Sequence, residues 1–221
     1  MIDIKIREEI ALKCPELTLG CISCKVETIN YNPALWEFTN EKIEEISKDI
    51  SNASIREMET IHSSKQAYKK LGKDPNRYRP SAESLLRRIV NGKGLYQINN
   101  VVDLLNLVSI TSGFSIGGYN EDKIVGQVNF GKGEANEEYE GIGRGKLNIE
   151  NLPMFRDEVG AFGCPTSDSI RTQVDENCQK FLMIIISFQG EKDLSPSIEF
   201  AKELLIKYAN GKEIETRIIK P

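Results

Sequence analysis

The side chain that enzymes use most often for proton transfer occurs once in this chain. His62 is the single histidine among 221 residues. Serine–histidine or cysteine–histidine catalysis is therefore possible only with His62 as the base, and a metal site with several histidines is impossible. Because His62 falls within a predicted helix, we interpret it as an ordinary helix residue rather than a catalytic base.

The chain has five cysteines, at positions 14, 21, 24, 164 and 178. An odd number is typical of reduced thiols in a cytosolic protein. Cys21 and Cys24 have the spacing of a redox or zinc half-site, but no second Cys-x-x-Cys completes four ligands. Both lie in a predicted strand, Leu19 to Val26, where residues three apart point to opposite faces. We interpret them as small core or surface residues, and we expect neither a metal nor a cofactor.

The most distinctive polar residues lie on an otherwise apolar helix predicted from Asn100 to Ser112. Apolar side chains cover most of its circumference, and they leave one narrow ridge, made of Asn99, Asp103, Asn106 and Ser109. A carboxylate among apolar residues costs several kcal/mol unless it is hydrogen-bonded. The ridge must therefore meet either the backbone of a neighbouring loop or a ligand.

Two glycine-bearing segments follow this helix. The first, Gly113 to Asn120, is predicted to be a turn and contains Gly117 and Gly118. The second, Val159 to Ser169, is a loop rich in glycine, serine and threonine. Such a loop can offer backbone N–H groups and hydroxyls to an anion or an amino acid.

The elements that must position these residues are helices and strands without a regular alternation, which indicates an α+β fold. Apolar periodicity and end signals predict helices from Pro33 to Ile50, Ile55 to Leu71, Ala82 to Asn91 after a Ser81 cap, and Ser197 to Ala209. Strands are predicted at Ile124 to Phe130, Lys146 to Ile149, Met154 to Phe155, Phe181 to Phe188 and Glu213 to Ile219, with an exposed acidic hairpin or loop from Gly131 to Gly145.

Length and composition are those of a globular protein, because 39% of the residues are hydrophobic and 28% are charged. The length predicts a single domain spanning residues 1–221. The longest apolar run, Phe181 to Ile186, is far shorter than the ~20 residues of a membrane span. The first residues do not have the pattern of a signal peptide. We therefore expect a cytoplasmic protein without a membrane-spanning segment.

Charge is unevenly distributed along the chain, whose net charge is −4. The segment from Lys65 to Lys93 holds nine cations and only two anions, Asp74 and Glu83. This basic segment is either a phosphate-facing patch or one solvated helix face. The first alternative predicts RNA contacts from Arg77, Arg79, Arg87 and Arg88.

Two stretches of sequence carry a resemblance to a known family. They are Tyr78-Arg-Pro-Ser-Ala-Glu-Ser-Leu-Leu-Arg-Arg88 and Leu95-Tyr-Gln-Ile-Asn-Asn-Val-Val-Asp-Leu-Leu-Asn106. Together they resemble the free-standing form of the B3/B4 domain of the phenylalanyl-tRNA synthetase beta subunit. The similarity is strongest over residues 60–190, while residues 1–60 form an N-terminal extension that we expect to pack on it.

The resemblance implies a three-layered fold, with an unusual β-sandwich flanked by helices, and an editing pocket that hydrolyses mischarged tRNA. The implied partner is the acceptor end of tRNA or an aminoacyl-tRNA. The pocket is expected between the helix ridge, the Gly117 turn and the Gly163 loop. Its expected residues are Asn99, Asp103, Asn106, Gly117, Gly118, Tyr119, Asn120, Gly163, Thr166, Ser167 and Asp168.

The chain also departs from that family. Gly117 stands where bacterial synthetases have a histidine, and Ile184 stands near the position of their glutamate. Their editing mechanism therefore cannot be transferred residue by residue. Two functions remain open: a stand-alone deacylase of misacylated tRNA, and a non-catalytic module that binds tRNA or an amino acid. A third alternative is an interaction protein that kept the fold and lost the pocket.

Overall fold

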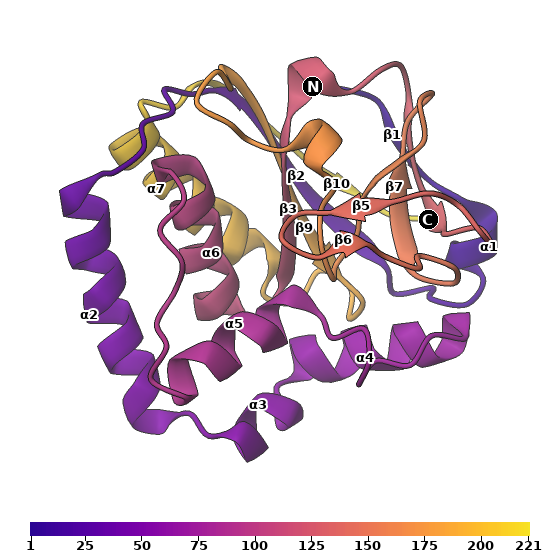
Figure 1. Ribbon diagram of the computed structural model, residues 1–221, viewed down its shortest axis with the longest axis horizontal. Helices are drawn as coiled ribbons and strands as arrows, with labels where there is room; N and C mark the ends of the chain where they lie inside the picture. The colour runs from indigo at the N-terminus through magenta and orange to yellow at the C-terminus, as the bar shows by residue number, and fades with distance from the viewer.

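The computed structural model describes all 221 residues and arranges most of them in three layers (Figure 1). A four-stranded sheet lies in the middle, with helices on one face and a second four-stranded sheet on the other. The two sheets form a β-sandwich flanked by helices. The predicted α+β, three-layered class is therefore confirmed.

The middle sheet is antiparallel throughout, and its strands stand in the order β10 (Lys212–Ile219), β2 (Thr18–Lys25), β9 (Lys180–Ser187) and β3 (Ser115–Asn120). Strand β9 is buried on both faces, as its continuous apolar run predicts. Cys21 and Cys24 of β2 point to opposite faces and pack in different cores, as their spacing predicts.

The outer sheet has the order β1 (Ile4–Ile6), β4 (Val128–Lys132), β7 (Pro153–Arg156) and β8 (Ala161–Gly163). Only the β1–β4 pair is parallel. Aromatic side chains of this sheet, Phe130, Phe155 and Phe162, pack against the middle sheet in a second core. A short hairpin of β5 (Glu140–Gly141) and β6 (Gly145–Lys146) lies outside both sheets.

The helices are α1 (Glu8–Ala11), α2 (Pro33–Asp49), α3 (Asn52–Glu57), α4 (Glu59–Leu71), α5 (Ser81–Val90), α6 (Asn100–Ser112) and α7 (Leu194–Ala209), with single 3₁₀ turns at η1 (Glu121–Lys123) and η2 (Ile170–Thr172). Helices α6 and α7 pack on the middle sheet, and α2 packs outside α6 (Figure 1). None of the helices combines the length and the apolar character that a bilayer crossing requires.

Helix α6 is held at both ends by its own sequence. The Asn99 side chain caps its first turn by accepting the Val102 N–H at 2.9 Å, and Gly113 ends it in the left-handed conformation with φ of 77°. Between these ends nearly every side chain is buried, as the apolar circumference predicts. Of the ridge residues, Asn99, Asp103 and Ser109 are buried and Asn106 is partly buried.

Two helix predictions are corrected by the structure. The single helix expected from Ile55 to Leu71 is two helices, because Met58 has an extended ψ of 125° that breaks the hydrogen-bond ladder between α3 and α4. Ser81 does not cap α5 with its side chain, since Pro80 holds the cap position and the Ser81 N–H donates to the Pro165 carbonyl at 2.7 Å. Helix α7 begins at Leu194, three residues before the predicted start.

Several strand predictions are also corrected. The expected glycine turn ends in strand β3, which pairs with β9 along its whole length. The strand expected from Ile124 begins only at Val128, because η1 and a turn at Gly126, with φ of 72°, occupy the preceding residues. Of the strand expected from Lys146 to Ile149, only Lys146 lies in a strand, the two-residue β6.

Candidate functional site

A small cavity of about 230 Å³ opens between α5, α6, β3 and the loop after β8. Fifteen residues line it, eight of them apolar: Ser81, Leu85, Ile98, Val102, Leu105, Asn106, Ser109, Ile116, Gly118, Ile142, Cys164, Ser167, Asp168, Gln173 and Val174. The three segments expected to converge therefore meet at one cavity. Its mixed lining suits a small group with an apolar body and a polar end.

Some residues of the polar ridge of α6 hold neighbouring segments in place, and others line the cavity. Asp103 is buried, and its carboxylate accepts the Ile98 N–H at 2.9 Å and the Trp36 indole N–H at 2.7 Å. The Asn99 side chain donates to the Val174 carbonyl at 3.3 Å as well as capping α6. Asn99 and Asp103 thus fix segments that supply cavity wall but do not line it themselves.

Asn106 and Ser109 occupy the next two positions along the ridge and do line the cavity. The Ser109 hydroxyl is already used, since it donates to the Phe114 carbonyl at 2.7 Å. The Asn106 amide makes no hydrogen bond within the protein and is only partly buried. It is therefore free to bind a ligand.

Asp168 provides the only ionisable carboxyl of the cavity. Its Oδ1 accepts the Tyr119 hydroxyl at 2.9 Å, and its Oδ2 accepts the Gly118 N–H at 3.4 Å. Burial raises the pKa of Asp168 to about 7, although the Tyr119 and Gly118 hydrogen bonds act in the opposite direction. A carboxyl that titrates near neutral pH can accept and return a proton during a reaction.

Tyr119 reaches Asp168 through a space that two glycines leave open. A β-carbon at Gly117 or at Gly163 would collide with the Tyr119 hydroxyl. Neither glycine serves a turn: Gly117 lies in β3 opposite Ile184, and Gly163 lies in β8 opposite Phe155. Gly117 and Gly163 therefore do not contact the cavity but make room for the side chain that holds Asp168.

Gly118 has a similar role and also touches the cavity. A β-carbon there would lie 2.5 Å from Leu105 Cδ1, so only glycine lets β3 approach α6 this closely. Its N–H is committed to Asp168. Gly118 therefore lines the cavity, but its N–H is already bonded within the protein.

Of the remaining residues predicted for the site, Asn120 and Thr166 make structural hydrogen bonds and Ser167 lines the cavity. The Asn120 side chain caps η1 by accepting the Asp122 N–H at 3.2 Å. The Thr166 hydroxyl bonds to the Tyr68 hydroxyl at 2.8 Å, which ties the loop to α4. Neither lines the cavity, whereas Ser167 does and its hydroxyl has no protein partner.

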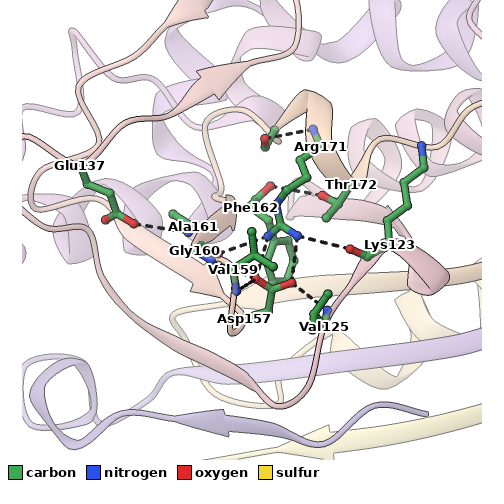
Figure 2. Close-up of polar contacts among 11 residues, drawn as sticks. Lys123, Val125, Glu137, Asp157, Val159, Gly160, Ala161, Phe162, Arg171 and Thr172 are labelled. Atoms are coloured by element: carbon green, nitrogen blue, oxygen red, sulfur yellow. Dashed lines mark hydrogen bonds and ion pairs between the residues drawn. The ribbon is translucent and has the colours of Figure 1, made fainter.

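The segment after Asp168 is held by a partly buried ion pair between Arg171 and Asp157 (Figure 2). Arg171 of η2 donates to both carboxylate oxygens of Asp157, at 3.0 and 2.8 Å, and also to the Gly160 carbonyl. Asp157 in turn accepts the N–H groups of Val125, Val159 and Gly160. Burial acts to raise the pKa of Asp157, but these donors outweigh it and hold the pKa below its ordinary value.

The histidine and the cysteines do not contribute an obvious catalytic group to this cavity. His62 lies on the exposed side of α4 and does not line it. Cys164 does line it, but burial raises the pKa of that thiol to about 12, so the thiolate is scarce at neutral pH. All five cysteines are free thiols.

Some residues that line the cavity were not predicted as site residues. Gln173, Ser81, Ile98 and Ile142 come from four separate segments and meet only in the folded chain. The side chains of Gln173 and Ser81 make no hydrogen bond within the protein. With Asn106 and Ser167 they supply unpartnered donors and acceptors to the same cavity as Asp168.

The basic segment is partly neutralised by one buried carboxylate. Glu83 is 1% exposed and pairs with Arg87 at 2.9 Å, Lys65 at 3.3 Å and Arg79 at 3.6 Å. Arg77 is exposed, and Arg88 makes no ion pair and lies over the Tyr96 ring. Of the four predicted RNA-binding arginines, only Arg77 and Arg88 therefore lack a carboxylate partner.

The fold and the cavity define a class: a three-layered α+β domain with a small pocket between its helices and its sandwich. The family model described as "B3/4 domain" matches residues 63–201, and the chain belongs to that family. No curated protein matches the chain.

Among solved structures, the chain is similar to an N-terminal fragment of the phenylalanyl-tRNA synthetase beta subunit from Pyrococcus horikoshii. The identity is 12% and the TM-score 0.50, and the alignment covers 99% of this chain and 54% of that one. The chain thus spans about half of that fragment, and the likeness concerns the fold.

Proposed function

We propose that this protein hydrolyses the ester of an aminoacyl-tRNA, with the aminoacyl group held in the Asp168 cavity. One observation carries the proposal: a carboxyl whose pKa is about 7 stands in a small, largely apolar cavity beside unpartnered amide and hydroxyl groups. The B3/4 family and the fold likeness to a phenylalanyl-tRNA synthetase fragment support an RNA-linked substrate.

The cavity size favours an aminoacyl group over a larger ligand. Its volume of about 230 Å³ is below the ≈ 300–1,000 Å³ typical of sites for drug-sized ligands and cofactors. The apolar wall of Leu85, Val102 and Leu105 would hold the amino-acid side chain. The ester and amino groups would then face Asn106, Ser167 and Asp168.

Asp168 takes the role of general base in this proposal. Its carboxylate removes a proton from a water molecule, whose oxygen attacks the ester carbonyl carbon. The Asn106 amide is available to donate to the developing oxyanion. The bond from the carbonyl carbon to the ribose oxygen then breaks, and the protonated Asp168 returns the proton to that oxygen.

The test is hydrolysis of tyrosyl-tRNA that bears the phenylalanine anticodon, with protein well below substrate. We expect turnover that falls about tenfold per pH unit below pH 7, because the protonated Asp168 cannot act as a base. Asp168→Asn should lose at least about 100-fold in rate, within the range of general-base contributions.

Asp49→Asn is the matched control, since Asp49 is an exposed carboxylate at the end of α2, outside the cavity. It should keep the wild-type rate and pH profile. Saturable binding without turnover would instead support the non-catalytic module, and an Asp168→Asn rate equal to wild type would remove Asp168 from the mechanism.

A further inference from the structure

The segment between α5 and α6 carries an exposed tyrosine two residues before a residue that lines the cavity. Tyr96 is 56% exposed, and Ile98, two residues later, lines the cavity while itself 52% exposed. Two residues span at most about 7 Å, so the Tyr96 backbone lies next to the cavity rim. The Ile98 N–H is fixed by Asp103, which holds this rim in place.

The Tyr96 ring is held by a guanidinium group. Arg88 Cζ lies 3.7 Å from the ring centroid, and its Nη1 donates to the Tyr96 hydroxyl at 2.8 Å. The same guanidinium donates to the Gly94 carbonyl at 3.1 Å, which fixes it to the loop. Arg88 has no carboxylate partner, so its positive charge is not neutralised by an ion pair as that of Arg87 is by Glu83.

We propose that Tyr96 and Arg88 form a stacking platform for the nucleobase of the nucleotide whose aminoacyl group enters the cavity. This inference rests on the proposed function. In such an ester the base and the aminoacyl group are attached to the same ribose, so the base must lie within one sugar ring of the cavity opening.

The chemistry of the pair fits a nucleotide. A tyrosine ring stacks on any base, and an arginine beside it adds a cation–π contact and attracts the neighbouring phosphate. An apolar protein surface would fit less well, since it would bury the Arg88 charge without a partner. The platform therefore predicts recognition of the end of an RNA strand rather than of a protein.

Two probes separate the platform from the cavity. The first is adenosine that carries a tyrosyl group on its ribose through an amide, which resists ester hydrolysis; the second is tyrosine N-methylamide, which has no nucleoside. We expect Tyr96→Ala to weaken binding of the first by about 5- to 150-fold, the range for one base stacked on an aromatic side chain. Binding of the second should change by less than about twofold.

Two control variants complete the test. Tyr96→Phe keeps the ring and should bind both probes like the wild type. Tyr31→Ala removes a comparably exposed tyrosine, 52% exposed, that does not line the cavity, and it should change neither affinity.

The outcomes distinguish the two proposals. If the wild type binds both probes and Tyr96→Ala weakens neither, or weakens both equally, the platform is overturned and the cavity keeps its proposed occupant. If the wild type binds neither probe, the proposed occupant of the cavity is overturned together with the platform.

Discussion

At the scale of single residues, Asp168 depends on neighbours that leave it partly desolvated and still hydrogen-bonded. Burial alone disfavours the carboxylate, and the Tyr119 hydroxyl is the largest of the opposing contributions to its pKa. Tyr119 is itself fully buried, and the same burial raises its own pKa well above the ordinary value. Tyr119 therefore acts as a neutral donor throughout the useful pH range.

Tyr119→Phe tests this relationship. Loss of the hydroxyl removes a hydrogen bond that favours the carboxylate, so the pKa of Asp168 should rise above about 7. The midpoint of the pH–rate profile should shift to higher pH by about one unit, while the rate at high pH changes much less. A profile measured from pH 5 to 9 checks the shift, and an unmoved midpoint would contradict it.

At the scale of elements, strand β3 is the part of the fold on which the cavity depends most. Its glycines let it approach α6 on one side and leave space for Tyr119 on the other. Neither Gly117 nor Gly118 has a positive φ, so the requirement comes from packing rather than from backbone conformation. This is why a glycine pair that predicts a turn in the sequence forms a paired strand.

Gly118→Ala should destabilise the protein, because the new β-carbon would lie 2.5 Å from Leu105 Cδ1. Overpacking of this kind costs about 1–3 kcal/mol. Leu105→Val removes that atom, so the double variant should lose less free energy of unfolding than the two single losses added together. Urea unfolding of the four proteins measures the coupling, and strict additivity would argue against the contact.

At the scale of the whole molecule, one buried carboxylate neutralises part of the basic segment from Lys65 to Lys93. Glu83 lies in the first turn of α5, is buried, and forms ion pairs with Lys65, Arg79 and Arg87. A carboxylate left unpaired in that position would be costly. The basic segment is therefore part ion-pair network and part open surface.

Arg87→Gln and Arg77→Gln should consequently differ. We expect Arg87→Gln to lower the free energy of unfolding by about 1–3 kcal/mol, since it removes a charged hydrogen bond to buried Glu83. Arg77→Gln, at an exposed position, should change stability by less than about 0.5 kcal/mol. Thermal unfolding of the two variants and the wild type measures both changes in stability.

Arg77→Gln also tests whether this arginine contributes to tRNA binding. If Arg77 faces a phosphate, Arg77→Gln should reduce the salt dependence of binding by a slope of about 0.7–0.9. Titrations at several salt concentrations measure the slope. An unchanged slope would place Arg77 outside any RNA interface.

Much of the fold was predictable because local sequence signals agreed with tertiary packing. The apolar circumference of α6, the continuous apolar run of β9 and the alternation of Cys21 and Cys24 each predict the burial that is observed. Helix boundaries were less predictable. The boundary between α3 and α4 at Met58 was missed because no glycine or proline stands there to indicate a break.

The candidate site was predicted in its segments, but only some of the individual residues expected in it line the cavity. Asn106, Gly118, Ser167 and Asp168 line the cavity, whereas Asn99, Asp103 and Thr166 hold its walls. A polar residue on an otherwise apolar, buried helix requires a hydrogen-bond partner. The sequence does not specify whether that partner is the backbone or a ligand. Only the distances from Asp103 to Trp36 and Ile98 decide it.

The sequence by itself determined most of the helices and strands, since hydrophobic periodicity is a local property that each element carries alone. The three-layered arrangement was expected only from the family resemblance. The tertiary structure decided the chemistry, because the pKa of Asp168 depends on burial and on donors that lie about fifty residues away in the chain. Desolvation and hydrogen bonding act through space, and no spacing along the chain encodes them.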